Sequence, residues 1–248
     1  MAPVLLVIAH GSRDPRHAET VHALCARVRS MRPGVRVEAG FLDHCTPSVP
    51  QVIDQLAAEG VREVVALPLL LTRAFHAKAD IPAVLRDASA RHGGLTVRQA
   101  GVLGPSPLLT AAMERRLYEA GVGPDERGST GIVLASAGST DPEAIAVIAE
   151  IAREWRRTGW CAVRPAFASA SLPRTSDAVA SLRAEGVRRV AVAPYVLAPG
   201  FLPDRIARGA GDADVLASVL GDAPEVARVV ILRYAEAARE GFPAGLVA

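Results

Sequence analysis

Three side chains that can bind a metal ion or accept a proton follow apolar runs in the first third of the chain. His10 closes the run 4–9, Asp43 comes just after a second run, and His76 follows a third. A neutral imidazole near pH 7 binds divalent metals or takes up a proton. Two histidines and a carboxylate can also form an open site with room for an incoming ligand. The pattern therefore predicts metal handling or proton transfer.

The chain contains the same unit twice, and these reactive groups occur in one copy only. The stretch 11–15 (GSRDP) recurs at 138–142 (GSTDP), and 58–62 (AEGVR) recurs unchanged at 184–188. At matching positions the second copy carries neutral replacements: Ala137 for His10, Ser169-Ala170 for Asp43-His44, and Leu202 for His76. Residues shared by both copies serve backbone geometry and packing, so the residues found in one copy are the candidates for chemistry.

Short apolar runs alternate with amphipathic segments, and this order predicts the elements that position the candidates. In the first copy we expect strands at 4–9, 35–41, 63–71 and 95–100, and helices from about 15, from Thr46-Pro47, at 77–91 and at 107–120. Alternating strands and helices indicate an α/β fold with a parallel sheet flanked by helices in each copy. The expected units are 1–122 and 130–242, followed by a tail at 243–248. Ligands bind at the carboxyl ends of the strands in such sheets, where the candidates lie.

The remaining histidines and the nearby nucleophiles fit structural roles better. His17 and His22 are five residues apart on one helix, and we expect both to be solvated. His92 precedes two glycines and fits a helix C-terminus. Ser12 recurs in the second copy and no G-x-S-x-G motif is present, so a turn or cap is the expected role of its hydroxyl. Cys45 lies near the site, but no neighbouring feature indicates an activated thiolate.

Composition limits the class of protein. The 248 residues carry a net charge of +2, so no overall basic field points to nucleic acid. Three cysteines without a C-x-x-C pair indicate a reduced, cytoplasmic setting rather than a disulfide framework. No apolar stretch approaches the length of a membrane span.

The motifs around the histidines resemble the sirohydrochlorin chelatase family (CbiX/SirB). They are the sequences AHGSRDP at 9–15, LPLLL at 67–71 and FHAKADIP at 75–82. The resemblance extends over both halves, like the long family members with two tandem class II chelatase units. It implies a chelatase-like fold with a cleft between two α/β units. It also implies a lyase-class enzyme that inserts Fe²⁺ or Co²⁺ into sirohydrochlorin, towards sirohaem or cobalamin.

The resemblance also assigns roles. The family's two metal-handling histidines correspond to His10 and His76, and the acidic residue after the second strand corresponds to Asp43. Which histidine binds metal and which accepts protons stays open, as does the division of roles between Asp43 and His44. The tetrapyrrole carries many carboxylates, and its ring face needs apolar contact. The candidates for substrate binding are Ser12, Arg13, Arg73, Phe75 and Lys78.

We expect the divalent metal, Co²⁺, Fe²⁺ or Ni²⁺, to be a substrate rather than a tightly bound cofactor. The expected partner is the tetrapyrrole, with no nucleic acid and no membrane, and the expected oligomeric state is a monomer. Two alternatives are a ferrochelatase for another tetrapyrrole, such as coproporphyrin, and a non-catalytic metal or tetrapyrrole carrier. Stoichiometric binding without turnover would identify the carrier.

Overall fold

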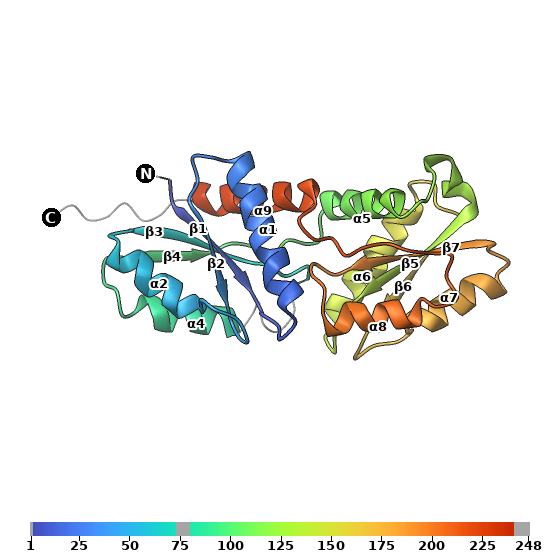
Figure 1. Ribbon diagram of the computed structural model, residues 1–248, viewed down its shortest axis with the longest axis horizontal. Coiled ribbons are helices and arrows are strands. Elements are labelled where there is room, and N and C mark those ends of the chain that lie inside the picture. The colour runs from blue at the N-terminus through green and yellow to red at the C-terminus, as the bar shows by residue number, and fades with distance from the viewer. Residues whose placement is uncertain (1, 73–79, 241–248) are drawn as a thin grey trace. The chain divides into compact units, whose positions relative to one another are not determined.

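The computed structural model describes residues 2–72 and 80–240 and contains two four-stranded parallel sheets (Figure 1). The first has the order β2-β1-β3-β4 and the second the order β6-β5-β7-β8. The strands are β1 (Val4–Ala9), β2 (Val37–Phe41), β3 (Glu63–Pro68), β4 (Thr96–Gln99), β5 (Thr130–Ser136), β6 (Ala162–Phe167), β7 (Arg189–Tyr195) and β8 (Val215–Leu216). The expected α/β class with a parallel sheet in each copy is confirmed.

Helices flank both sheets. They are α1 (Pro15–Met31), α2 (Val49–Ala58), α4 (Asp80–Ser89), α5 (Pro107–Glu119), α6 (Pro142–Arg156), α7 (Thr175–Ala184), α8 (Phe201–Gly209) and α9 (Pro224–Arg239), with a 3-10 helix at Pro124–Ser129. No described helix is long and apolar enough to cross a membrane.

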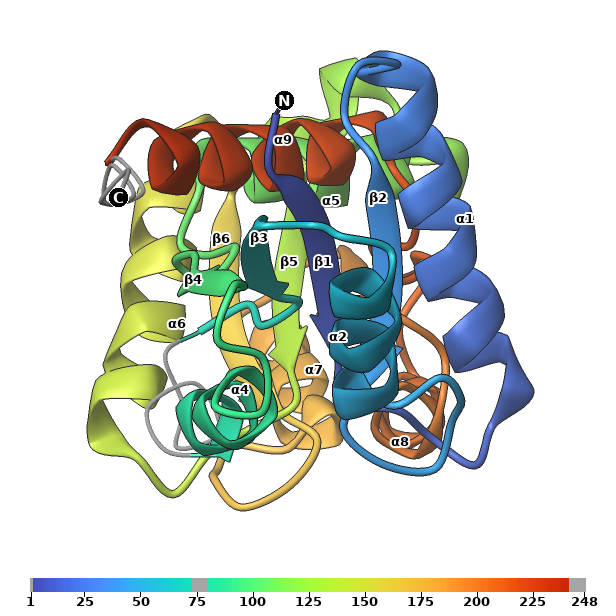
Figure 2. The ribbon, with the colours of Figure 1, turned by 90° about the vertical axis from the view of Figure 1, so that its left-hand side faces the viewer.

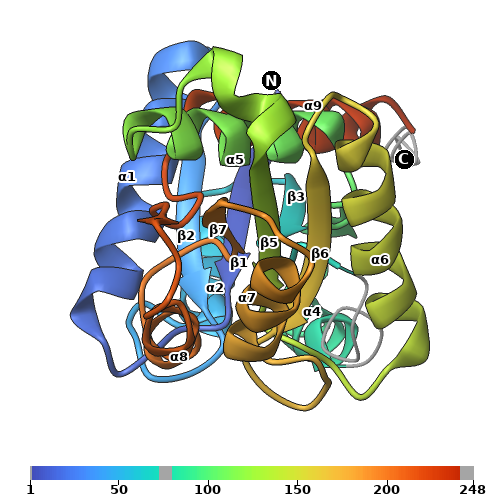
Figure 3. The same cartoon turned by 90° about the vertical axis from the view of Figure 1, so that its right-hand side faces the viewer.

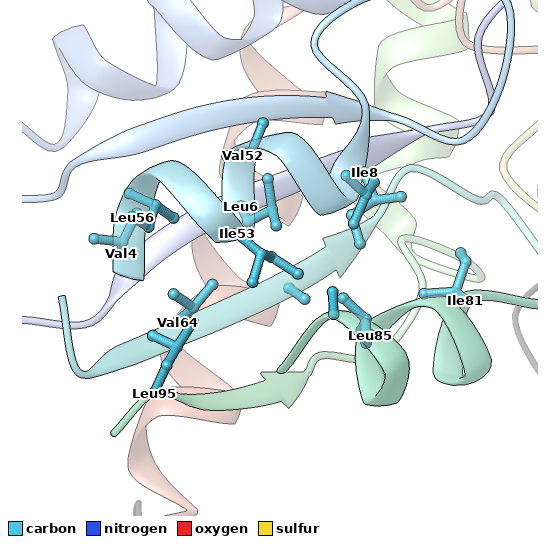
Figure 4. Packing of buried hydrophobic residues seen from close by; sticks show 13 residues of the cluster. Val4, Leu6, Ile8, Val52, Ile53, Leu56, Val64, Ile81, Leu85 and Leu95 are labelled. Carbon is cyan, nitrogen blue, oxygen red and sulfur yellow. The ribbon is translucent and has the colours of Figure 1, made fainter. Parts of the chain in front are cut away.

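The buried face of the first sheet explains why β1 is apolar throughout. Every residue of β1 is buried, and alternate side chains such as Leu6 belong to a cluster with Ile53 and Leu56 of α2 and Leu85 of α4. Figure 4 shows these side chains meeting between the strands and the two helices. Figure 2 shows β2 and β1 side by side, with α2 in front of them.

The second sheet repeats this arrangement. The cluster that covers it includes Val179 and Leu182 of α7, Ile206 of α8 and Val192 of β7. Figure 3 looks onto these elements, with β5 and β6 side by side. Because both sheets have the same strand order, the carboxyl end of β5 is the counterpart of the carboxyl end of β1.

The compact units differ from the expected boundaries of 122 and 130, because the last helix of each sequence repeat belongs to the other unit. Unit 1 comprises Met1–Gly104 with the segment from Val226 onward, and unit 2 comprises Pro105–Glu225. Side-chain bonds hold the exchanged helices in place. In unit 2, Glu114 of α5 accepts hydrogen bonds from the indole nitrogens of Trp155 (2.9 Å) and Trp160 (3.2 Å). In unit 1, the Tyr234 hydroxyl of α9 donates to the carbonyl of Pro3 at 2.7 Å.

Candidate functional site

His10 is exposed and directly follows β1, where two loops are joined by backbone hydrogen bonds. The amide of Asp43 donates to the carbonyl of His10 at 2.9 Å, and the amide of Leu42 donates to the carbonyl of Ala9 at 3.0 Å. These bonds extend the β1–β2 pairing by two residues beyond the end of the sheet. They place His10 and Asp43 on neighbouring loops, as the strand order requires.

Close approach of the two loops requires glycine at position 11. Gly11 has φ +94°, and a Cβ atom built on it would lie 1.8 Å from the carbonyl oxygen of Asp43. Any larger residue would have to displace the Asp43 loop, in addition to adopting a backbone conformation that side chains disfavour. Gly138 has the same role in unit 2, with φ +92° and a distance of 1.9 Å to the carbonyl oxygen of Ser169.

Asp43 and His44 form a pair rather than two independent groups. The Oδ2 atom of Asp43 lies 3.2 Å from Nε2 of His44, and Oδ1 accepts a hydrogen bond from the His44 amide at 2.8 Å. The Asp43 side chain is 62% exposed and His44 35% exposed. His44 also has a positive φ of 60°, a conformation that is uncommon outside glycine. A carboxylate paired in this way orients the imidazole.

Ser12 has the turn role expected from its recurrence. Its hydroxyl accepts a hydrogen bond from the Asp14 amide at 3.1 Å, and Ser139 repeats the contact with Asp141 at 3.0 Å. Asp14 then caps α1 by accepting from the Arg16 amide at 3.0 Å. The Cys45 thiol also supports this turn, since it donates to the carbonyl of Ser12 at 3.2 Å.

Arg13 is exposed beside this turn, and it forms no ion pair with an acidic side chain of the described residues. Its guanidinium is therefore available to a carboxylate ligand. The other predicted residues of this part of the site, His76, Arg73, Phe75 and Lys78, lie outside the described residues. Within residues 2–72 and 80–240, no group of three or more His, Cys, Asp or Glu side chains is placed to hold a metal ion.

His17 is not solvated as expected. It is half-buried on α1, its Nδ1 atom is buried without a hydrogen-bond partner among the described residues, and its ring centroid lies 6.5 Å from that of Phe41. Burial lowers the pKa of His17, and the charge of His10 lowers it further. The position matching His17 in the second copy is Ala144. The comparison of copies that singled out His10 therefore also contained the signal for His17.

The other two histidines are as expected. His22 is exposed on α1, although its ring lies 5.8 Å from the buried ring of Phe41. His92 lies just beyond α4, and its Nε2 atom is 2.7 Å from Oδ1 of Asp54. Neither is placed with the groups around His10.

Comparisons with known proteins agree with the repeat and the fold. The CbiX family pattern matches residues 4–120 and 131–237. A sirohydrochlorin cobaltochelatase of Priestia megaterium is 27% identical over 82% of this chain and 66% of its own length. A sirohydrochlorin ferrochelatase of Bacillus subtilis is 26% identical over 96% of this chain and 93% of its own. The solved structure of SirB from Bacillus subtilis with Fe³⁺ has a TM-score of 0.82 at 23% identity, covering 96% of both chains, and shows the same fold.

Proposed function

This chain belongs to the CbiX family, and we propose that it is a sirohydrochlorin chelatase, a lyase-class enzyme that inserts Co²⁺ or Fe²⁺ into the tetrapyrrole. One observation carries the proposal. The paired loops at the ends of β1 and β2 hold His10, Asp43 and His44, whereas the same loops in unit 2 hold Ala137, Ser169 and Ala170. Both pairs of loops have the same backbone bonds, so the reactive groups are not needed for the fold.

The chemistry requires a proton acceptor and a weak metal site. When a divalent metal enters the macrocycle, two pyrrole N–H bonds break, two metal–nitrogen bonds replace them, and two protons leave. A neutral His10 imidazole can take up one proton or guide the metal to the ring face. The second histidine of the proposed site is His76. A tight four-ligand cage would oppose transfer of the metal, so exposed, sparse ligands suit the task.

The Asp43–His44 pair supplies a second acceptor beside His10. The Asp43 carboxylate orients the His44 imidazole, since its Oδ2 atom lies 3.2 Å from Nε2. The exposed Arg13 guanidinium is suited to a peripheral carboxylate of the substrate. The Ser12 hydroxyl is already engaged in the turn, so we propose that Ser12 positions the loop rather than touching the substrate through its side chain.

The test is multiple-turnover metal insertion by the purified protein. Sirohydrochlorin in excess would be mixed anaerobically with Co²⁺ or Fe²⁺, and the metal-free chromophore followed by its absorbance. We expect many equivalents converted per chain and two protons released per metal, measured with a pH indicator. Conversion of coproporphyrin but not sirohydrochlorin would instead identify a ferrochelatase for another tetrapyrrole. Saturation at one equivalent would identify a carrier.

A further inference from the structure

Asp43, His44 and Cys45 form a tight turn just beyond β2. The amide of Cys45 donates to the carbonyl of Asp43 at 2.7 Å, and His44 between them has a φ of 60°. A hydrogen bond that closes three residues around a positive φ is typical of a γ-turn of the rare, strained kind. Such a conformation persists where the surrounding structure holds it in place.

Both ends of this γ-turn are attached to the loop that follows β1. At its start, the amide of Asp43 donates to the carbonyl of His10 at 2.9 Å. At its end, the half-buried thiol of Cys45 donates to the carbonyl of Ser12 at 3.2 Å, across 33 residues of sequence. His44 therefore lies between two attachments, one made by the backbone and one made by the Cys45 side chain.

The second copy has the same turn and the same attachment with different side chains. The amide of Ser171 donates to the carbonyl of Ser169 at 2.6 Å, and Ala170 between them has a φ of 59°. The hydroxyl of Ser171 donates to the carbonyl of Ser139 at 2.5 Å, as the Cys45 thiol does in unit 1. A side-chain donor at the third position of the turn is therefore a feature of both copies, although its chemistry differs.

The turn in unit 1 carries the Asp43–His44 pair, whereas the turn in unit 2 carries Ser169 and Ala170. The distance of 3.2 Å between the Asp43 carboxylate and the His44 imidazole depends on the backbone between them, and so on the φ of His44. A residue with a Cβ atom gains free energy when it leaves the positive-φ region. If one end of the turn were released, the backbone at His44 would relax and its imidazole would move away from Asp43.

We infer that Cys45 is a positioning residue for metal insertion: its thiol holds the strained turn, so that His44 and Asp43 stay paired on the loop beside His10. The inference rests on the proposed function. In it the thiol acts as a hydrogen-bond donor and neither binds the metal nor takes up a proton. Because a thiol is a weak donor and a hydroxyl a stronger one, serine should replace Cys45 without loss.

The test compares three substitutions in the full chain. Cys45→Ala removes the donor, Cys45→Ser supplies the donor found in unit 2, and Ser171→Ala removes the equivalent bond in unit 2. The readouts are kcat and KM for insertion of Co²⁺ into sirohydrochlorin, together with Tm. The comparison separates the loss of a hydrogen bond in general from the loss of the one that holds the Asp43–His44 pair.

We expect Cys45→Ala to lower kcat by tenfold or more, with a smaller change in KM, because losing a group that orients a reactive side chain has effects of this order. Cys45→Ser should stay within about twofold of the wild-type kcat. Cys45→Ala and Ser171→Ala should lower Tm alike, by roughly 2–4 °C for one hydrogen bond. Ser171→Ala should nevertheless keep kcat within about twofold.

Three results would overturn the inference. An unchanged kcat in Cys45→Ala would show that the bond to Ser12 is not needed. Equal losses in Cys45→Ala and Cys45→Ser would show that the sulfur itself takes part in the chemistry. A fall in kcat for Ser171→Ala as large as that for Cys45→Ala would show that any loss of stability slows the enzyme.

Reversible modification tests the same bond in a chain that is already folded. Methyl methanethiosulfonate, applied in a Cys161→Ser background, converts the Cys45 thiol into a mixed disulfide that has no S–H donor. We expect kcat to fall as in Cys45→Ala and to return after reduction with dithiothreitol, whereas the same treatment should leave the double variant Cys45→Ser/Cys161→Ser unaffected. Full modification, verified by mass, with an unchanged kcat would also overturn the inference.

An NMR measurement distinguishes failure of this inference from failure of the proposed function. The imidazole C–H signals of the six histidines are recorded without substrate, and His44→Gln assigns the signal of His44. Cys45→Ala should shift or broaden that signal, and Cys45→Ser should restore it. If the wild type does not metallate sirohydrochlorin, the proposed function fails, while the His44 signal still reports whether Cys45 holds the turn. A His44 signal unmoved by Cys45→Ala overturns the inference in either case.

Discussion

Replacing Gly11 with alanine tests whether the close approach of the β1 and β2 loops organises the site. The new methyl group would lie 1.8 Å from the carbonyl oxygen of Asp43, at a φ of +94°. The backbone conformation alone costs about 1–2 kcal/mol. Relieving the overlap also breaks the hydrogen bond from the Asp43 amide to the His10 carbonyl, which costs about 1–3 kcal/mol. We therefore expect a loss of about 3 kcal/mol.

Two further glycines provide matched controls. Gly60 has a φ of +79° with no atom near the added methyl group, so Gly60→Ala measures the backbone penalty without the overlap. Gly138→Ala reproduces the overlap in unit 2, at 1.9 Å from the carbonyl oxygen of Ser169. In calorimetry, Gly11→Ala and Gly138→Ala should lower Tm by roughly 6–12 °C and Gly60→Ala by about a third of that, since 1 kcal/mol corresponds to about 2–4 °C at this size.

Activity distinguishes the two loop variants. Gly11→Ala should reduce kcat for metal insertion by about a hundredfold, because displacing catalytic groups by about 1 Å has effects of that size. Gly138→Ala displaces a loop that carries none of the proposed catalytic groups, so it should lower Tm while kcat stays close to the wild-type value. Equal Tm values for Gly11→Ala and Gly60→Ala, or full activity in Gly11→Ala, would show that the close approach of the two loops does not organise the site.

Three other predictions follow from buried groups. Glu114→Ala leaves the buried indole N–H groups of Trp155 and Trp160 without an acceptor, so it should destabilise unit 2 by about 3 kcal/mol. The free energy of unfolding is measured by denaturation with the fluorescence of these two tryptophans as the signal. A loss no larger than that of Glu119→Ala, which removes an exposed ion pair, would contradict the prediction. Burial raises the pKa of the Cys25 thiol to about 11. A thiol reagent at pH 8 should therefore label Cys45 and leave Cys25 unlabelled until the chain unfolds. Rapid labelling of Cys25 in the native protein would contradict its burial. Because the pKa of His17 is lowered, the folded state binds fewer protons than the unfolded chain, so stability should fall as pH drops below about 6.5. The Tm of His17→Gln should therefore fall less than that of the wild type between pH 7.5 and 5.5. Equal falls in Tm would argue against a lowered pKa of His17.

The repeat and the carboxyl ends of β1 and β2 were predictable because they depend on local patterns, whereas β3 was expected to reach residue 71 and ends at Pro68. Apolar runs, glycine-containing turns and their recurrence locate the carboxyl edge of each sheet and the groups on it. The exchange of α5 and α9 was not predictable in this way. An apolar stripe on a helix shows that one face is buried, but not which sheet buries it. The contacts that decide the matter, such as Glu114 with Trp155, join residues far apart in the sequence.

The start of α2 shows a smaller difference with a clear cause. The sequence predicted Thr46 as the cap, whereas the helix begins at Val49 with Ser48 as its cap and Gln51 completing a capping box. The carbonyl of Pro47 instead accepts a hydrogen bond from the amide of Phe41 at 3.0 Å. The chain therefore stays extended beside the end of β2 for two more residues. A pairing of this kind cannot be read from a local capping motif.

The most direct test of the proposed site is the rate of metal insertion by His10→Ala and His76→Ala. His22→Ala is the matched control, since His22 is an exposed histidine on α1 of the same unit and is not one of the proposed site residues. The three variants and the wild type would be assayed with sirohydrochlorin and Co²⁺, after melting curves have confirmed that they fold alike. We predict that both site variants lose at least a hundredfold in rate while His22→Ala keeps the wild-type rate. Turnover retained in a folded His10→Ala or His76→Ala variant would contradict it.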